Sequence, residues 1–255
     1  MSGRCIMMCA GEYHPMEIEI RQDDFVVAVD GGLAYLQEEG IEPDLLLGDF
    51  DSLEDTGCGG KKLSETIARY RAMGPDHFLQ LPVVKDDTDT MAAARLGLEK
   101  GYREFLIYGA MGGRPDHLMA NIQTMVFILH KGGQAWMLDR ETRMTVIGPG
   151  EFRLPADFEG TVSLFALDSC LENVTIRGMK YEVEGATVRN DYPVGCSNET
   201  LPSESVAEAG SVAGAGNGAE AESGAEAGSG AEAMILIGKG AGLLIMTEGL
   251  KNRHH

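Results

Sequence analysis

The chain has few features that would tie it to nucleic acid, an anionic membrane or a disulfide framework. Lys and Arg number 21 against 40 Asp and Glu, so the formal net charge is -19 at pH 7. Such an excess of negative charge argues against nucleic acid or an anionic membrane surface as a partner. The cysteines form no CxxC pair and no zinc-like spacing, which fits a reducing cytosol better than a disulfide scaffold. They are Cys5, Cys9, Cys58, Cys170 and Cys196.

Long apolar runs are absent as well. No run approaches the roughly 20 residues of a membrane-spanning helix, and the N-terminal residues lack the apolar stretch of a signal peptide. A Walker A motif is also missing, which disfavours a P-loop kinase, and the nearest match, GKGAG at Gly238–Gly242, lacks the required order. With 44% hydrophobic residues, the sequence predicts a soluble, cytoplasmic protein with a substantial core.

Up to about Leu138, short apolar runs alternate with segments of helical spacing. The expected strands cover residues 5–9, 25–29, 45–47, 78–84 and 105–111, and the expected helices cover residues 33–39, 62–73, 88–100 and 115–131. Strands and helices in alternation predict an α/β, Rossmann-like domain with a parallel sheet covered on both faces.

After roughly Arg140 the pattern changes to short β-branched runs separated by Gly, Pro and Asp. Regular short strands of this kind are typical of an antiparallel sandwich or barrel. We therefore expect a boundary near 139–142, with domains at 1–140 and 141–255. Residues 202–233 consist almost wholly of Gly, Ala, Ser and Glu, with six glutamates and no Lys or Arg. This composition predicts a flexible acidic loop between two strands.

Three aspartate-rich motifs follow apolar runs in the first region: GDFDS at 48–52, KDDTDT at 85–90 and GGRPDH at 112–117. In an open α/β sheet, the loops that leave the carboxyl ends of the strands form the ligand crevice. Acidic loops that converge on one rim would suit a hard divalent cation and the phosphates that it carries.

In GDFDS, Asp49 and Asp51 are two residues apart, so in an extended chain both carboxylates would point the same way. A magnesium ion between them would remove their mutual repulsion. An Asx turn explains the motif equally well. Asp30 is followed by two glycines, Gly31 and Gly32, which permit a sharp turn and close approach to a ligand, although a plain turn accounts for them too.

In KDDTDT, Lys85 ends a run while Thr88 and Asp89 open a helix. Asp86 or Asp87 would serve as the N-cap, and Asp89 would be favoured by the helix dipole in the first turn. Capping needs one acid, however, and this loop offers three beside a lysine. That surplus favours a charged ligand.

In GGRPDH, Gly112 and Gly113 permit an unusual backbone and Pro115 suits the first helical position. Arg114 opposes the helix dipole there, which a bound phosphate would explain through the arginine and free backbone N–H groups. Asp116 flanks the proline on its other side. His117 and Asn121 follow on the same helix, and for His117 the pattern favours core packing or a hydrogen bond over catalysis.

Together these motifs resemble the thiamine pyrophosphokinase family. DGG at 30–32, GDFDS, the Thr88-Asp89 pair, GGRPDH and GCSNE at 195–199 occur in the order found in that family. The resemblance runs from about residue 6 to 200 and resumes at about 234. It implies an α/β catalytic domain followed by a β-sandwich. The acidic stretch at 202–233 departs from the family pattern, and the single tryptophan, Trp136, lies away from the family's aromatic position.

The resemblance also implies roles for individual residues. Asp49, Asp51 and Asp89 look like ligands of Mg²⁺, and Arg114 and Asp116 stand beside the transferring group. Tyr181 matches an aromatic position against thiamine, although it would serve equally as an ordinary strand aromatic, and Ser197 and Asn198 match a Ser-Asn pair. The remaining positions implied for substrate or nucleotide binding are Asp30, Gly31, Lys85, Thr88, Gly113 and Asn121.

The implied reaction transfers diphosphate from ATP to thiamine and releases AMP, in a homodimer whose active sites are shared between subunits. Acidic loops at strand ends would also suit a magnesium-dependent phosphohydrolase. A nucleotide- or thiamine-binding module without turnover is a third alternative. The second domain, with Tyr181 and the Ser197-Asn198 pair, favours the transferase, because a simple hydrolase would not need it.

Overall fold

The computed structural model describes residues 3–16, 18–50, 60–82, 86–201 and 233–249 of the chain. The chain divides into two compact units, residues 1–147 and 148–255. The predicted boundary near 139–142 lies a few residues earlier than this division. The difference arises because Thr142–Ile147 pairs antiparallel with the strand before it and so belongs to the first unit.

The first unit alternates strands and helices, with two strands at each end of the series. In order, its elements are β1 (Cys5–Met8), β2 (Phe25–Val29), α1 (Gly32–Glu38), β3 (Leu45–Gly48), α2 (Gly60–Met73), β4 (Phe78–Gln80), α3 (Asp89–Glu99), β5 (Glu104–Tyr108), α4 (Pro115–His130), β6 (Gln134–Leu138) and β7 (Thr142–Ile147). The four predicted helices therefore form within one or two residues of their expected bounds.

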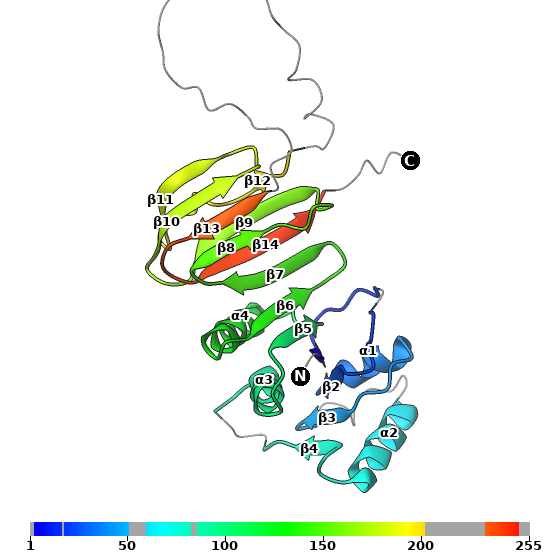
Figure 1. The fold of residues 1–255 in the computed structure, drawn as a ribbon. Helices are drawn as coiled ribbons and strands as arrows, with labels where there is room; N and C mark the ends of the chain where they lie inside the picture. Colours follow the sequence, from blue (N-terminus) through cyan, green and yellow to red (C-terminus); the bar gives the residue numbers. More distant parts are fainter. Residues whose placement is uncertain (1–2, 17, 51–59, 83–85, 202–232, 250–255) are drawn as a thin grey trace, which may run out of the picture. The chain divides into compact units, whose positions relative to one another are not determined.

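Within this unit the strands lie in the order β7-β6-β5-β1-β2-β3-β4. All neighbours pair in parallel except β6 and β7. Helices α1 and α2 lie on one side of the sheet and α3 and α4 on the other (Figure 1). The order reverses direction at β1, since β2 lies on one side of it and β5 on the other. Ligands of open α/β sheets bind beyond the carboxyl ends of strands at such a switch point.

Central strands of this sheet are apolar along their whole length because helices cover both of their faces. Every residue of β1, β2 and β3 is buried, as expected for a parallel sheet. Two predicted strands end several residues earlier than their apolar runs. The run at 105–111 leaves the sheet at Tyr108, because Gly109 adopts a left-handed backbone with φ +59°. The run at 78–84 is a strand only to Gln80, and residues 83 and 84 lie outside the described part.

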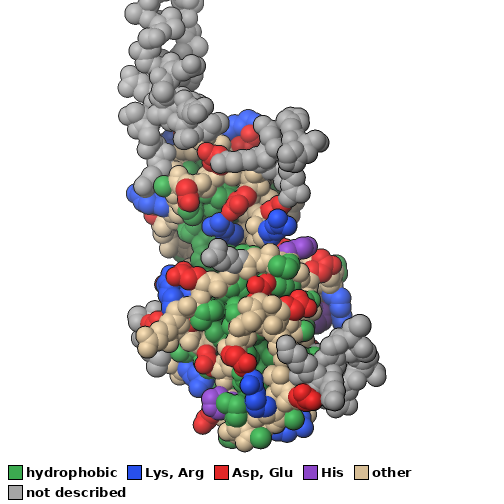
Figure 2. Space-filling view, turned by 90° about the vertical axis from the view of Figure 1, so that its right-hand side faces the viewer, with side chains coloured by type: hydrophobic (Ala, Val, Ile, Leu, Met, Phe, Trp, Pro, Cys, Tyr) green, Lys and Arg blue, Asp and Glu red, His purple; other side chains and the backbone are tan. Residues whose placement is uncertain are grey.

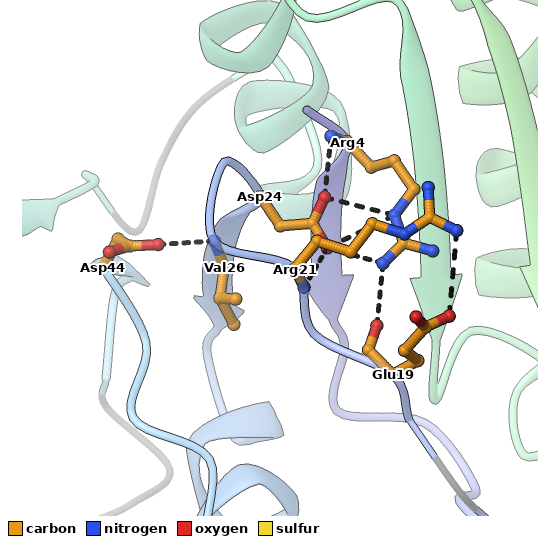
Figure 3. A network of polar contacts seen from close by, with 6 residues as sticks. All are labelled: Arg4, Glu19, Arg21, Asp24, Val26 and Asp44. Atoms are coloured by element: carbon orange, nitrogen blue, oxygen red, sulfur yellow. Dashed lines mark hydrogen bonds and ion pairs between the residues drawn. The ribbon is translucent and has the colours of Figure 1, made fainter. Parts of the chain in front are cut away.

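A buried ion pair lies at the amino ends of β1 and β2 (Figure 3). The Arg4 guanidinium and the Asp24 carboxylate approach to 2.5 Å, and their side chains are 10% and 0% exposed. Asp24 also accepts hydrogen bonds from the backbone N–H groups of Arg4 and Arg21, while Arg4 donates to the Glu19 carbonyl. Burial alone would raise the pKa of Asp24, but these hydrogen bonds outweigh it and leave that pKa below its ordinary value.

The second unit is built of antiparallel strands only. They are β8 (Gly150–Arg153), β9 (Gly160–Ala166), β10 (Cys170–Arg177), β11 (Val183–Arg189), β12 (Asn198–Glu199), β13 (Met234–Ile237) and β14 (Gly242–Glu248). Strands β12, β9 and β14 pair in that order, and β11, β10, β13 and β8 form a separate sheet. The predicted α/β domain followed by an antiparallel β-sandwich is confirmed. The acidic stretch predicted at 202–233 falls, except for its last residue, outside the described part of the chain.

The described surface mixes charges of both signs. On the face in Figure 2, acidic and basic side chains are interspersed, with hydrophobic side chains visible between them. Among the described helices, none combines the length and the apolar character needed to span a bilayer.

Candidate active site

A cavity of about 520 Å³ lies in the first unit, beyond the carboxyl ends of β1, β2 and β5. The starts of α3 and α4 complete its wall. Six of the predicted site residues line it: Asp30, Thr88, Asp89, Gly113, Arg114 and Asn121. Asp49, Gly31 and Asp116 are not among its lining residues. Asp51 and Lys85 lie outside the described part of the chain.

Asp30 occupies the turn between β2 and α1. Its backbone is left-handed, with φ +49°, and its N–H donates to the Leu47 carbonyl at 2.8 Å. The Oδ1 atom of its carboxylate is buried. We expected the two glycines to make this turn, yet Gly31 has an ordinary φ of −61°. Gly32 is needed for close packing instead, since a Cβ there would lie 2.0 Å from the Met8 carbonyl oxygen.

Asp49 follows β3, the strand next to β2, so it lies on the same rim of the sheet as Asp30. The residue after it, Phe50, has a left-handed φ of +56°. The prediction that Asp49 and Asp51 point together assumed an extended chain, and at Phe50 the chain is not extended. A non-glycine residue is held in this conformation only by its surroundings. The buried Phe50 ring stacks on Phe78 at 5.1 Å between centroids and anchors the turn in the core.

Helix α3 begins with the Thr88-Asp89 pair. Thr88 is the N-cap, and its hydroxyl accepts a hydrogen bond from the Met91 N–H at 3.1 Å. The prediction of Asp86 or Asp87 as the cap was therefore wrong, because the helix starts later than the acids suggest. Asp89 lies in the first turn, as expected. Burial raises the pKa of the Cys9 thiol to about 12, and the negative charge of Asp89 adds to that rise.

Arg114 is the N-cap residue of α4 and Pro115 begins the helix. The guanidinium of Arg114 donates to both carboxylate oxygens of Asp116, through Nε at 3.1 Å and Nη2 at 2.6 Å. Asp116 therefore balances the charge of Arg114 without a phosphate. These bonds lower the pKa of Asp116. The Nη1 group of Arg114 makes no hydrogen bond to the described residues and stays available to a ligand at the cavity.

Residues near the start of α4 shape the other wall of the cavity. Asn121 is buried and donates from Nδ2 to the Ala110 carbonyl at 3.0 Å, so it fixes the loop after β5. Gly112 has φ +77°, and a Cβ there would collide with the Glu12 side chain. His117 is exposed and lines the cavity, which excludes the predicted core packing.

Sequence reasoning missed the loop after β1. Cys9, Glu12 and Tyr35 all line the cavity. The Gly11 N–H donates to the Gly109 carbonyl at 2.8 Å, and the Tyr35 hydroxyl donates to the Gly11 carbonyl at 2.9 Å. The rule that strand ends carry the site applies to β1 as well. This loop contributes one acid to the cavity wall, Glu12, rather than an aspartate cluster, so it did not stand out.

The predicted residues of the second unit form a separate group. The Asn198 side chain accepts from the Tyr181 N–H at 2.9 Å and donates to the Tyr181 carbonyl at 2.8 Å. Its amide therefore fixes the Tyr181 backbone, while Tyr181 as a whole residue is 61% exposed. Ser197 has a left-handed φ of +57°, and its N–H donates to the Ser163 hydroxyl at 2.9 Å.

The donor chemistry of the cavity suits a hard cation, since Glu12, Asp30 and Asp89 contribute carboxylates to its wall. Within the described ranges, no group of three or more His, Cys, Asp or Glu side chains is close enough to hold a metal ion. Asp51, one of the three predicted ligands, is not within those ranges. The predicted set of Asp49, Asp51 and Asp89 therefore stays a prediction.

Two family models match the chain in sequence order. One describes the thiamin pyrophosphokinase catalytic domain and matches residues 16–137, and the other describes the thiamin pyrophosphokinase vitamin B1 binding domain and matches residues 151–208. Thiamine pyrophosphokinase of Bacillus subtilis is 27% identical over 178 residues, which cover 69% of this chain and 78% of that protein.

Solved structures share the fold. A crystal structure of the Bacillus subtilis thiamine pyrophosphokinase superposes with a TM-score of 0.72 at 21% identity, covering 98% of this chain and 100% of that one. The enzyme of Geobacillus thermodenitrificans gives a TM-score of 0.69 at 22% identity, with 98% of both chains covered. At this level of identity the structures support the fold, while the two ordered domain models carry the assignment. The chain belongs to the thiamin pyrophosphokinase family.

Proposed function

We propose that this protein transfers the terminal diphosphate of ATP to the hydroxyl of thiamine, giving thiamine diphosphate and AMP. The observation that carries the proposal is the ordered match to the family's catalytic and vitamin B1 binding domains. The cavity at the switch point of the sheet supports it, because phosphate-bearing ligands of α/β folds bind there.

In this reaction the thiamine hydroxyl oxygen attacks the β-phosphorus of ATP, and the bond from that phosphorus to the α–β bridging oxygen breaks. The hydroxyl proton is lost and AMP leaves. Such a transfer asks the protein mainly for positioning and for neutralisation of charge. When bound, Mg²⁺ would neutralise negative charge on the phosphates, and we propose Asp49, Asp51 and Asp89 as the residues that would hold it.

Side chains at the cavity would orient the phosphates. Arg114 is held by Asp116 with its Nη1 group left over, so it can bind a phosphate oxygen without losing that support. We propose Lys85 as a second cation and Asp116 as a group that also orients the attacking hydroxyl. Asp30, Gly31, Thr88, Gly113 and Asn121 complete the proposed nucleotide and substrate contacts.

Thiamine would contact the second unit through the exposed ring of Tyr181 and the turn at Ser197. The two hydrogen bonds from Asn198 to the Tyr181 backbone support a positioning role for that amide. We further propose a cytoplasmic homodimer in which the catalytic unit of one subunit and the sandwich of the other form each active site.

The reaction is tested by identifying the nucleotide product after incubation with ATP, Mg²⁺ and thiamine. We expect AMP and thiamine diphosphate in equal amounts, and AMP only when thiamine is present. Thiamine-independent phosphate release would indicate a hydrolase instead, and no product would indicate a binding module. Chelation of the divalent metal should abolish product formation, and added Mg²⁺ should restore it.

The carboxylates are tested by Asp89→Asn, which keeps the size of the side chain and removes its charge. We expect the turnover number to fall at least about 100-fold, the scale of losing one major electrostatic element. Asp76→Asn is the matched control, because Asp76 is an exposed residue before β4 that does not line the cavity. Near-normal turnover of Asp89→Asn would exclude Asp89 as a metal ligand.

A further inference from the structure

A second cavity of about 520 Å³ lies between α3 and α4, away from the candidate active site. It is lined by Arg95, Leu98, Glu99, Arg103, Phe127 and Lys131, and we call it the α3/α4 pocket. The two helices pack against each other on one side of the sheet (Figure 1). The pocket is lined by residues near their C-terminal ends, whereas the candidate active site is lined by residues near their N-terminal ends.

Positive charge is in excess at this pocket, although the chain as a whole carries -19 at pH 7. Three of the lining residues are cationic and one, Glu99, is acidic. Helix C-termini favour nearby cations, which explains why basic residues are tolerated at this end. The helix dipole does not explain why three basic residues line one pocket.

The charges of two of these cations are not neutralised by carboxylates of the described residues. Arg103 donates from Nη1 to the carbonyls of Leu98 and Tyr102, at 3.1 and 2.7 Å, which fixes the guanidinium but leaves its charge uncompensated. Lys131 lies 5.5 Å from the centre of the Phe127 ring and makes no ion pair with the described residues. A fixed guanidinium and a nearby ammonium are groups that bind phosphate oxygens.

The third cation connects the pocket with the active-site loop. Arg95 lies 5.6 Å from the centre of the Phe127 ring and forms an ion pair with Asp87 at 3.3 Å. Asp87 directly precedes Thr88 and Asp89, which line the candidate active site. An anion in the pocket would therefore compete with Asp87 for Arg95.

We propose that the α3/α4 pocket binds a small phosphate-bearing molecule, and that binding weakens the Arg95–Asp87 ion pair. The linkage is reciprocal: if the anion weakens the ion pair, loss of the ion pair strengthens binding of the anion. Binding at this pocket does not depend on the proposed function, so the two ideas fail separately.

The test is a titration of the full chain with inorganic phosphate, followed by amide chemical shifts of Leu98 and Gly132 in ¹H–¹⁵N spectra. We expect saturable shifts, and at least about 10-fold weaker binding in Lys131→Gln. Lys100→Gln is the matched control, since Lys100 is the C-cap residue of α3 but does not line the pocket and lies over Phe25 instead. No saturation, or an equal loss of binding in Lys100→Gln, would overturn the proposal.

The competition is tested by Asp87→Asn, which should tighten phosphate binding about two- to five-fold, the scale of one exposed ion pair. Asp86→Asn removes the same charge one residue away and should have a smaller effect. Equal effects of the two variants would refute the coupling. A parallel titration with AMP identifies the source of the phosphate: affinity above that of inorganic phosphate indicates a nucleotide, and equal affinity indicates the phosphate group alone.

Discussion

Arg4 and Asp24 show how single residues outside the candidate site hold the first unit together. Five hydrogen bonds surround the Asp24 carboxylate, three from the Arg4 guanidinium and two from backbone N–H groups. They connect the start of β1 with the turn that begins β2. A buried ion pair contributes little net stability against an apolar replacement of both partners, but removal of one partner leaves an uncompensated charge.

The Arg4→Met variant removes that partner and leaves the Asp24 carboxylate buried. We expect the free energy of unfolding to fall by about 3–5 kcal/mol, measured by denaturant titration at pH 7. Arg21→Ala is the control. It breaks only an exposed ion pair with Glu19, at 3.7 Å with side chains 52% and 74% exposed, and should cost under about 1 kcal/mol. Equal losses of unfolding free energy in Arg4→Met and Arg21→Ala would mean that the buried ion pair matters no more than the exposed one.

Low pH should remove the contribution of the Asp24 carboxylate to the free energy of unfolding. Because the pKa of Asp24 is lowered in the folded protein, its stabilising effect is present above the unfolded value of about 3.9 and is lost as pH falls through the folded value. Wild-type protein should therefore lose more unfolding free energy between pH 5 and pH 3 than Asp24→Asn does. Parallel pH profiles of the two proteins would contradict this assignment.

Residues of the site could be found from sequence only where a motif concentrated them. Asp30, Asp89 and Arg114 line the cavity, and each directly follows a strand or opens a helix. Conformation was harder to predict. The left-handed backbones of Asp30 and Phe50 are imposed by tertiary packing, and nothing in the local sequence distinguishes them from ordinary turn residues.

At the scale of elements, Gly, Pro and Asp in the sequence indicate the ends of the helices well. Apolar runs overestimate the length of the strands. The segment 105–111 is apolar throughout, but its last three residues form a loop in which Met111 bridges to Glu12. An apolar run indicates that a segment is buried, but not that it is a strand. Loops that form the wall of a cavity are buried too. Helix α3 was located correctly while its cap was not, since several residues before Thr88 have side chains that can cap.

The cap gives a prediction for α3. Thr88→Ala removes the hydroxyl that accepts the Met91 N–H and should lower the unfolding free energy by about 1 kcal/mol, while Thr88→Ser should be close to neutral. Denaturant unfolding measures both variants. If Asp87→Ala destabilised the protein more than Thr88→Ala, the cap would have been assigned to the wrong residue.

At the scale of the whole molecule, alternating and then purely β-type patterns were enough to predict the fold class. They did not predict that the loop after β1 would join the site. That loop meets the loop after β5 through the Gly11–Gly109 hydrogen bond, a contact between segments almost a hundred positions apart. The order of the strands in the sheet determines which loops are neighbours. The hydrophobic periodicity of the sequence does not determine that order.

The net charge gives a prediction for the entire chain. At -19, repulsion between carboxylates should destabilise the compact state at low ionic strength. Raising sodium chloride from about 10 mM to about 150 mM shortens the screening length from about 30 Å to about 8 Å, so the midpoint of thermal unfolding at pH 7 should rise. The buffer should contain no phosphate, to avoid ligand binding. A midpoint that falls with salt would show that attractive pairs dominate.

The position of Phe50 limits how the loop at 49–51 can be redesigned. Its ring belongs to the hydrophobic core of the first unit, yet it stands between two aspartates proposed to bind the metal. In a library that randomises positions 49–51, Phe50 should tolerate as little change as its acidic neighbours, although it does not line the cavity of the candidate active site. Redesign of this loop for another nucleotide would have to retain the aromatic anchor and seek its variation elsewhere on the rim.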